Sequence, residues 1–302
     1  MRAIPNALIL MVLPFFMFSC KKNDTVDDGT TTYNNSTAKV IFKYKFDSTQ
    51  VRLNNIGQPA AIPAGRAGQS PRFNAMSSHY IELAPGDFTA IGGGVVAYKA
   101  PETTAGGSNA IDFAQSVKKG DGEVFYEFPI NRIPPGSYKH LRISLAYQNY
   151  DITFKFGSTL FPGTVASFIG YNTYISSFNV KTQPLAVNAA KLQGFWAFEA
   201  VGTVNSGQAP PGATTVPNPL YASSPIPSGS CLVTGAFLNA GGTQTPLVIT
   251  GNETTNIMVT VSLSINKSFE WIEVNTDGYY EPTAGEVVVD MGIRGLKPFV
   301  GL

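Results

Sequence analysis

Residues 257–265 read Ile257-Met258-Val259-Thr260-Val261-Ser262-Leu263-Ser264-Ile265, with an apolar side chain at every second position. Successive side chains of a β-strand point to opposite faces of its sheet, so this alternation predicts a strand with one buried face. It is the clearest strand signal in the chain, and it leads us to look for the same alternation in other segments.

Weaker forms of the same pattern recur along the chain. Val40, Phe42, Tyr44 and Phe46 alternate with more polar residues, and Leu141, Ile143, Leu145 and Tyr147 are expected on one face of another strand. A short helix is expected only within Val165–Ile175. Further strands are expected at His79–Leu83, Val95–Lys99, Glu123–Ile130, Tyr138–Tyr147, Asp151–Phe156, Tyr174–Val180, Leu192–Val201, Cys231–Leu238, Pro246–Thr250 and Val287–Met291.

Composition agrees with an all-β protein. Charged residues make up 14% of the chain, below the average of about 25%, and the chain has 30 Gly and 21 Pro. Short strands between Gly/Pro turns predict a β-sandwich, jelly-roll or immunoglobulin-like, with long Gly/Pro-rich loops. We assign residues 38–302 to one sandwich domain. A boundary between two smaller domains within 205–230 is the alternative, because residues 200–252 carry no charged side chain and Gln208–Gly229 is rich in proline.

The N-terminus has the organisation of an export signal. Arg2 precedes an apolar run over 7–18, and the small residue Ser19 stands before Cys20. The run is shorter than the roughly 20 residues that a transmembrane helix needs. An ordinary secretory signal that happens to contain a cysteine is one interpretation.

Ser19-Cys20 followed by Lys21-Lys22 resembles a bacterial lipoprotein signal, most closely those of Bacteroidetes, although Met17 and Phe18 depart from the usual residues. The resemblance implies that residues 1–19 are a signal peptide and that Cys20 is acylated, for example with palmitate. Residues 20–37 would be a flexible tether, and the protein would be anchored by lipid in the outer membrane. The tether's Asp24, Asp27 and Asp28 resemble signals for export to the cell surface.

Two triplets, Asp24-Thr25-Val26 and Asp47-Ser48-Thr49, resemble the acceptor motif for O-glycosylation in exported Bacteroidetes proteins. The resemblance implies glycosylation at Thr25 and Ser48.

The sequence offers little for catalysis. His79 and His140 are the only histidines, and no GxSxG, HExxH, CxxC or P-loop motif occurs. Without residues 1–19 the charges balance, which argues against a nucleic-acid partner. We therefore expect a non-enzymatic binding or structural module for a glycan, a peptide or an outer-membrane protein. A secreted hydrolase on the same fold is the alternative. The candidate stacking residues are Tyr147, Tyr150, Tyr171, Tyr174, Phe195, Trp196, Trp271, Tyr279 and Tyr280.

One segment carries a pattern typical of calcium ligands. Glu273, Asn275 and Asp277 followed by Gly278 match positions 1, 3, 5 and 6 of an EF-hand loop, and Glu281 falls at position 9. The pattern breaks at position 12, where Ala284 replaces the bidentate Glu. The sequence thus predicts a Ca²⁺ site at Glu273, Asn275, Asp277 and Glu281, with a plain Asp-Gly turn as the alternative.

The order of several segments is similar to that of MbnP-like proteins, which are exported β-sandwich proteins, some of them copper-binding. The segments are His79–Leu83, Ile133–Tyr138 and Gly194–Glu199. The resemblance implies the sandwich fold for residues 38–270. A copper-type metal protein is a further alternative, although copper sites favour His, Met and Cys and this chain has few histidines.

The lipoprotein interpretation predicts that Cys20→Ala is released from the membrane fraction or mislocalised, because this variant lacks the acyl chains that anchor the protein. Fractionation of cells that express the full chain, followed by immunoblotting, measures this. Cys231→Ala is the matched control and should stay in the membrane fraction. Normal membrane retention of Cys20→Ala would contradict the interpretation.

Overall fold

The structure is a computed structural model that describes residues 31–53, 59–209 and 231–301. The described chain is built from strands, and its helical elements are the short 3₁₀ turns η1 (Ile130–Arg132) and η3 (Pro282–Ala284). The all-β prediction is confirmed. Among the described residues, no helix combines the length and hydropathy needed to cross a bilayer.

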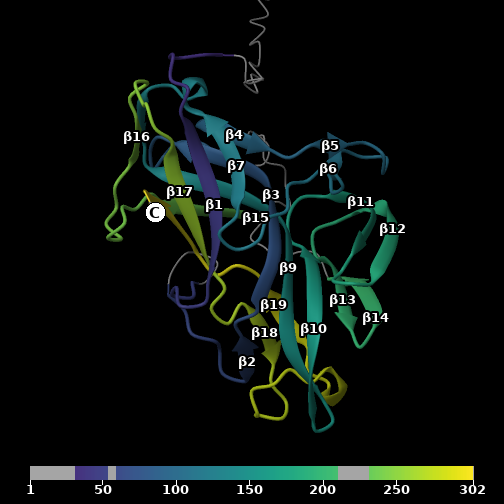
Figure 1. Cartoon of the computed structure of the whole chain (residues 1–302). Coiled ribbons are helices and arrows are strands. Elements are labelled where there is room, and N and C mark those ends of the chain that lie inside the picture. Colours follow the sequence, from purple (N-terminus) through teal and green to yellow (C-terminus); the bar gives the residue numbers. More distant parts are fainter. Residues whose placement is uncertain (1–30, 54–58, 210–230, 302) are drawn as a thin grey trace, which may run out of the picture.

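Two sheets face each other in the main body (Figure 1). One has the strand order β20–β17–β1–β7, and the other has the order β14–β13–β10–β9–β3–β4, with β15 also paired to β9. Their bounds are β1 (Lys39–Asp47), β3 (Arg72–Ala84), β4 (Val95–Lys99), β7 (Val124–Pro129), β9 (His140–Phe156), β10 (Thr159–Phe168), β13 (Phe195–Ala200), β14 (Thr203–Gln208), β15 (Cys231–Ala236), β17 (Ile257–Ser264) and β20 (Leu296–Val300).

The alternating segments form the centre of the first sheet. β1 and β17 pair in parallel from Val40↔Ile257 to Asp47↔Ser264. Their alternate side chains are fully buried against the second sheet, as the pattern predicts. These side chains are Val40, Phe42, Tyr44, Val259, Val261 and Leu263. Since burying a large apolar side chain contributes about 1.5–3 kcal/mol, this face is a main source of stability.

Strand β9 is long, and its side chains change faces partway along. It pairs with β3 and, over its second half, with β10. Ser78 pairs with Leu145 and Ser77 with Tyr147, so Ala146 has no partner in β3. The partner strand is irregular at the same place, since Tyr80 pairs with Ser144 and His79 has no partner in β9. We call this irregularity of β9 the β-bulge at Ala146. Before the bulge the odd-numbered residues such as Leu145 belong to the main core, and after it even-numbered residues such as Tyr150 do.

The prediction that Tyr147 shares a face with Leu141, Ile143 and Leu145 is therefore wrong. Tyr147 lies in a second core, on the opposite side of the second sheet. The physical reason is the bulge, since one additional residue reverses a pattern of period two.

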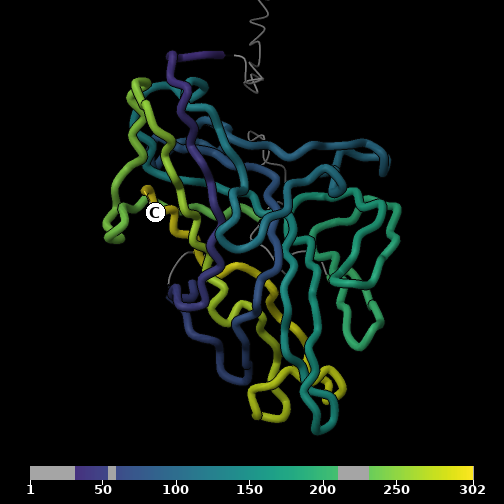
Figure 2. The backbone as a smooth tube through the Cα atoms, viewed as in Figure 1, coloured from purple at the N-terminus to yellow at the C-terminus, as the bar shows by residue number. Residues whose placement is uncertain are grey.

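A smaller sheet, β12–β11–β6–β5, covers this second core. Its strands are β5 (Glu102–Thr103), β6 (Ala110–Asp112), β11 (Thr173–Asn179) and β12 (Pro184–Lys191). The buried side chains of the second core are Phe113, Tyr147, Ala166, Phe168, Ile175, Val180, Phe195 and Ala197. The molecule thus has three layers in this region, and the tube in Figure 2 follows the chain through them.

The short helix expected within Val165–Ile175 is not formed. Residues 165–168 belong to β10 and residues 173–175 to β11. β10 lies between the two cores, with Val165 facing one and Phe168 the other. A strand buried on both faces has apolar residues without alternation, which resembles a helical segment in sequence.

The remaining strands form two small sheets. β16 (Leu247–Ile249) pairs with β8 (Gly136–Tyr138), and β18 (Phe269–Ile272) lies between β19 (Val288–Met291) and β2 (Arg66–Gln69). Contacts with the domain begin slightly before Ala38, since the backbone N–H of Tyr33 donates to Asn131 O at 2.7 Å and Ser36 Oγ donates to Glu253 O at 2.6 Å.

Gly170→Ala should lower the free energy of unfolding by about 1–3 kcal/mol, as overpacking does. An added Cβ would lie 2.1 Å from Leu145 O, beside the bulge. Gly136→Ala is the control, because its nearest atom would be 3.9 Å away, and it should change stability by less than about 0.5 kcal/mol. Urea denaturation of both variants measures the difference, and equal effects would contradict the packing described at the bulge.

Candidate functional site

Two elements form one end of the molecule (Figure 1). The β9–β10 hairpin turns at Gly157, which has a positive φ of 60°, and residues 273–287 connect β18 to β19. The connection is attached to the hairpin, since the backbone N–H of Lys155 donates to Tyr280 O at 2.8 Å and Phe154 forms a bridge with Tyr280. We call this end the tip.

A lysine on the hairpin binds the acidic connection. Lys155 Nζ forms ion pairs with Asp277 and with Glu281, the latter at 3.0 Å. The hydrogen bond from Lys155 is the main cause that lowers the pKa of the Asp277 carboxyl, and the same contacts raise the pKa of Lys155. The ammonium group of Lys155 offsets the repulsion between the neighbouring carboxylates of Asp277 and Glu281.

The residues predicted to bind calcium all lie in this connection. Glu273 Oε1 accepts from Gly278 N at 2.8 Å, Asn275 Nδ2 donates to Glu281, and Asp277 accepts from Tyr279 N at 3.0 Å. Among the described residues, no group of three or more His, Cys, Asp and Glu side chains is arranged to hold a metal. Calcium binding stays a prediction.

Glu286 organises the connection from its centre. Its carboxylate accepts from Val274 N at 3.0 Å and from Glu281 N at 2.6 Å, and Glu286 is almost fully buried. These bonds span the whole loop. Glu286 lies two residues after Ala284, the position at which the EF-hand pattern requires a glutamate. The pattern therefore does not predict the structural role of Glu286.

Apolar side chains are exposed at the tip. Phe156 is 57% exposed and Val287 is 58% exposed. The backbone N–H of Ile272 donates to Val287 O at 2.9 Å, so Ile272 and Val287 lie side by side. Sequence analysis missed this group because its members come from two distant segments. We call the following residues the tip patch: Phe156, Leu160, Ile272, Val274, Tyr279 and Val287.

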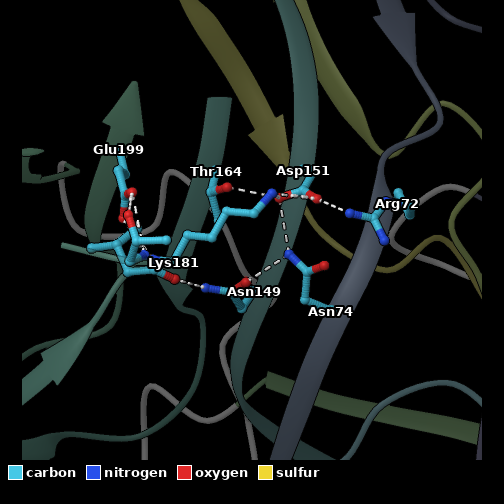
Figure 3. Close-up of polar contacts among 9 residues, drawn as sticks. Arg72, Asn74, Asn149, Asp151, Thr164, Lys181 and Glu199 are labelled. Carbon is cyan, nitrogen blue, oxygen red and sulfur yellow. Dashed lines mark hydrogen bonds and ion pairs between the residues drawn. The ribbon is translucent and has the colours of Figure 1, made fainter. Parts of the chain in front are cut away.

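A row of polar side chains fixes β9 and β10 behind the tip (Figure 3). Asp151, Thr164 and Glu199 are opposite one another on β9, β10 and β13. Asp151 accepts from Thr164 Oγ1 at 2.7 Å, from Asn74 Nδ2 and Lys181 Nζ at 3.0 Å, and from Arg72. Burial works to raise the pKa of the Asp151 carboxyl, but these hydrogen bonds outweigh it and lower the pKa.

Glu199 holds the turn between β11 and β12. Its carboxylate accepts the backbone N–H groups of Lys181, Thr182 and Gln183 at 2.7, 2.9 and 3.0 Å. Burial works to raise the pKa of Glu199, and hydrogen bonds lower it further than burial raises it. Because the folded-state pKa is lowered, the stability from this contact is present at neutral pH and is lost as the pH falls through that pKa.

Most of the candidate stacking aromatics are not surface residues. Tyr147, Tyr150, Phe195 and Trp271 are buried in the cores, whereas Tyr171, Tyr174, Trp196 and Tyr280 are half-buried. Tyr279 alone among the nine candidates is exposed, and it belongs to the tip patch.

The two histidines are separate. His79 Nε2 lies 2.8 Å from Glu102 Oε1 and its ring stacks on Tyr171, while His140 Nε2 lies 3.6 Å from Asp87. Burial works to raise the pKa of Glu102, but hydrogen bonds from His79 and Asn109 lower it to about 2. The copper-type alternative stays a hypothesis.

Three other predicted residues are placed as follows. Ser48 is exposed directly after β1, whereas Cys20 and Thr25 lie outside the described residues. Burial raises the pKa of the Cys231 thiol to about 12, which disfavours the reactive thiolate.

Comparison with protein-family models, curated proteins and solved structures finds no match to this chain.

If the connection binds Ca²⁺, EDTA should lower the melting temperature and Ca²⁺ should restore it, with a stabilisation of about 2.7 kcal/mol at a hundredfold excess over Kd. Lys155→Met should strengthen the response, because the ammonium group competes for the carboxylates of Asp277 and Glu281.

Asp277→Ala should abolish the calcium response in thermal melts, whereas Asp87→Ala, which removes an exposed carboxylate away from the tip, should preserve it. The calcium site would be contradicted if neither EDTA nor Ca²⁺ changed the melting temperature of the wild-type protein or of Lys155→Met. Asp277-Gly278 would then be a plain turn.

Proposed function

We propose that this chain is a lipid-anchored protein of the cell envelope that acts as a non-enzymatic binding module. Acylation of Cys20 would hold it in the outer membrane, and the tip patch would dock a peptide or protein partner. The observation that carries the proposal is that six exposed apolar residues belong to two distant segments that are attached to each other at one end of the molecule.

The position of the patch supports this function. The first described residues lie at the end of the molecule opposite the tip (Figure 1). A chain held by lipid ahead of residue 31 would therefore present the tip patch away from its anchor. A partner in the envelope could reach the patch without displacing the tether.

The chemistry of the patch favours a peptide or protein over a glycan. Isolated apolar side chains are common on surfaces, but several of them exposed on two attached elements favour an interaction site. Four of its six members are aliphatic, and only Phe156 and Tyr279 have a ring on which a sugar would stack. Aliphatic surface instead complements apolar side chains of another polypeptide.

The patch is supported by a rigid base. The polar row around Asp151 fixes the strands of the hairpin, and Glu286 fixes the connection from within. A preorganised surface loses little conformational entropy on binding, so a small patch can bind with useful affinity.

The proposal predicts that Phe156→Ser and Tyr279→Ser each reduce partner capture roughly tenfold, as loss of an aromatic interface anchor does. Tagged full-length protein would be purified from solubilised outer membranes, and co-purifying proteins would be quantified by mass spectrometry. Leu192→Ser is the matched control, since Leu192 is 64% exposed but does not belong to the tip patch. Unchanged capture by both patch variants, or equal loss in the control, would refute docking at the tip.

A further inference from the structure

The outer face of the β19–β18–β2 sheet carries a cluster of arginines around one buried carboxylate. Glu270 on β18 is 1% exposed, although a carboxylate is rarely buried unless it is paired. Arg66 Nη1 lies 2.9 Å from Glu270 Oε1, and Arg52 binds Glu270 Oε2. Arg294 Nη2 lies 3.9 Å from the same Oε2, and it also pairs with Asp290.

The charges of this cluster do not balance. Three guanidinium groups meet two carboxylates, those of Glu270 and Asp290. Asp47 lies near Gln50, whose backbone N–H it accepts at 3.1 Å, but its ion pair is with Lys45 and not with an arginine of the cluster. One positive charge is therefore left without a counter-charge among the described ion pairs.

Hydrogen-bond donors in the cluster are also unused. Among the described residues, the buried atoms Arg52 Nε, Arg294 Nε and Gln50 Nε2 have no acceptor. They belong to adjoining segments, because Leu53 N donates to Arg294 O at 2.7 Å and Gln50 Nε2 lies 3.1 Å from the Cβ position of Gly295. Leaving a charged donor buried without a partner destabilises the folded state.

The burial of the cluster makes the excess charge costly. Burial, together with the neighbouring charges of Arg52 and Arg66, lowers the pKa of Arg294 to about 10, while Glu270 opposes this shift. An anion beside the arginines would offset the repulsion and accept from the free donors. Guanidinium groups bind carboxylate and phosphate oxygens with matching geometry.

Arg66 is the exposed edge of this otherwise buried cluster, and it lies next to the tip patch. The Arg66 side chain is 41% exposed, and Arg66 pairs directly with Ile272 across β2 and β18. Residues opposite each other in an antiparallel pair project from the same face, so the guanidinium of Arg66 borders an exposed apolar member of the patch.

We propose that Arg52, Arg66 and Arg294, together with Gln50, form an anion-binding subsite for a carboxylate or phosphate group. Building on the proposed function, the subsite defines the partner: a polypeptide segment whose acidic or phosphorylated residue lies next to apolar ones. The apolar residues cover the tip patch while the anion enters beside Arg66.

The test uses the purified full-length protein in detergent and inorganic phosphate as the probe. Titration calorimetry and thermal melts would compare phosphate with acetate, each against sodium chloride at equal ionic strength. Phosphate should bind and raise the melting temperature, and a response to acetate as well would identify carboxylate as a ligand. Arg66→Gln should weaken phosphate binding roughly tenfold, the effect of losing one charge-assisted hydrogen bond.

Two further variants make the result decisive. Arg72→Gln is the matched control, since Arg72 lies outside the cluster, its side chain is 75% exposed and it pairs with Asp151, so phosphate binding should be unchanged. Gln50→Glu places a carboxylate among the arginines and should abolish phosphate binding while raising the melting temperature in its absence. The subsite would be overturned if phosphate gave no response beyond that of chloride. It would also be overturned if Arg66→Gln and Gln50→Glu bound phosphate as strongly as the wild-type protein does. A phosphate response without partner capture would instead refute only the docking function.

Discussion

The β-bulge at Ala146 is the constraint on which the rest of the structure depends. One additional residue lets a single strand supply Leu145 to the main core and Tyr147 to the second core. The backbone carbonyl of the buried bulge residue binds the end of β10, since Ala146 O accepts from Ile169 N at 2.9 Å and from Gly170 N at 3.2 Å. These bonds position the end of β10 and the chain that leads into the small sheet, so the third layer follows from the bulge.

The tip depends on the same strand. Beyond the bulge, the odd-numbered positions of β9 face the second core and carry Asp151, around which the polar row assembles. The even-numbered positions face the main core and lead to Phe154 and then to Phe156 in the tip patch. The hairpin is therefore held by apolar packing on the side of the main core and by the polar row around Asp151 on the opposite side. The connection of residues 273–287 is attached to this hairpin through Lys155, and it carries half of the tip patch, namely Val274, Tyr279 and Val287.

The sequence predicts those parts of the fold where one face of a strand is buried. β17 and β1 alternate because one side faces the core, and their segments were expected within a residue or two. β10 is buried on both faces, and β14 is largely exposed on both faces. Neither strand therefore shows the alternation of apolar and polar residues that predicts a strand. The bulge has no signature, because only the pairing of β3 with β9 shows that Ala146 is additional. Of the candidate sites, the acidic connection was visible in sequence because its residues are local. The tip patch and the arginine cluster were not, since the fold brings together residues as distant as Arg52 and Arg294.

The side on which each tyrosine of β9 packs tests the central role of the bulge most directly. The measurement is a crystal structure of the mature chain that resolves residues 140–170, or NOE contacts of the two rings in solution. The bulge predicts Tyr147 against Phe113 and Phe168 in one core and Tyr150 against Phe73 in the other. If Tyr147 instead packs on the same side as Leu145, with uninterrupted pairing of β3 and β9, the three-layered account is wrong.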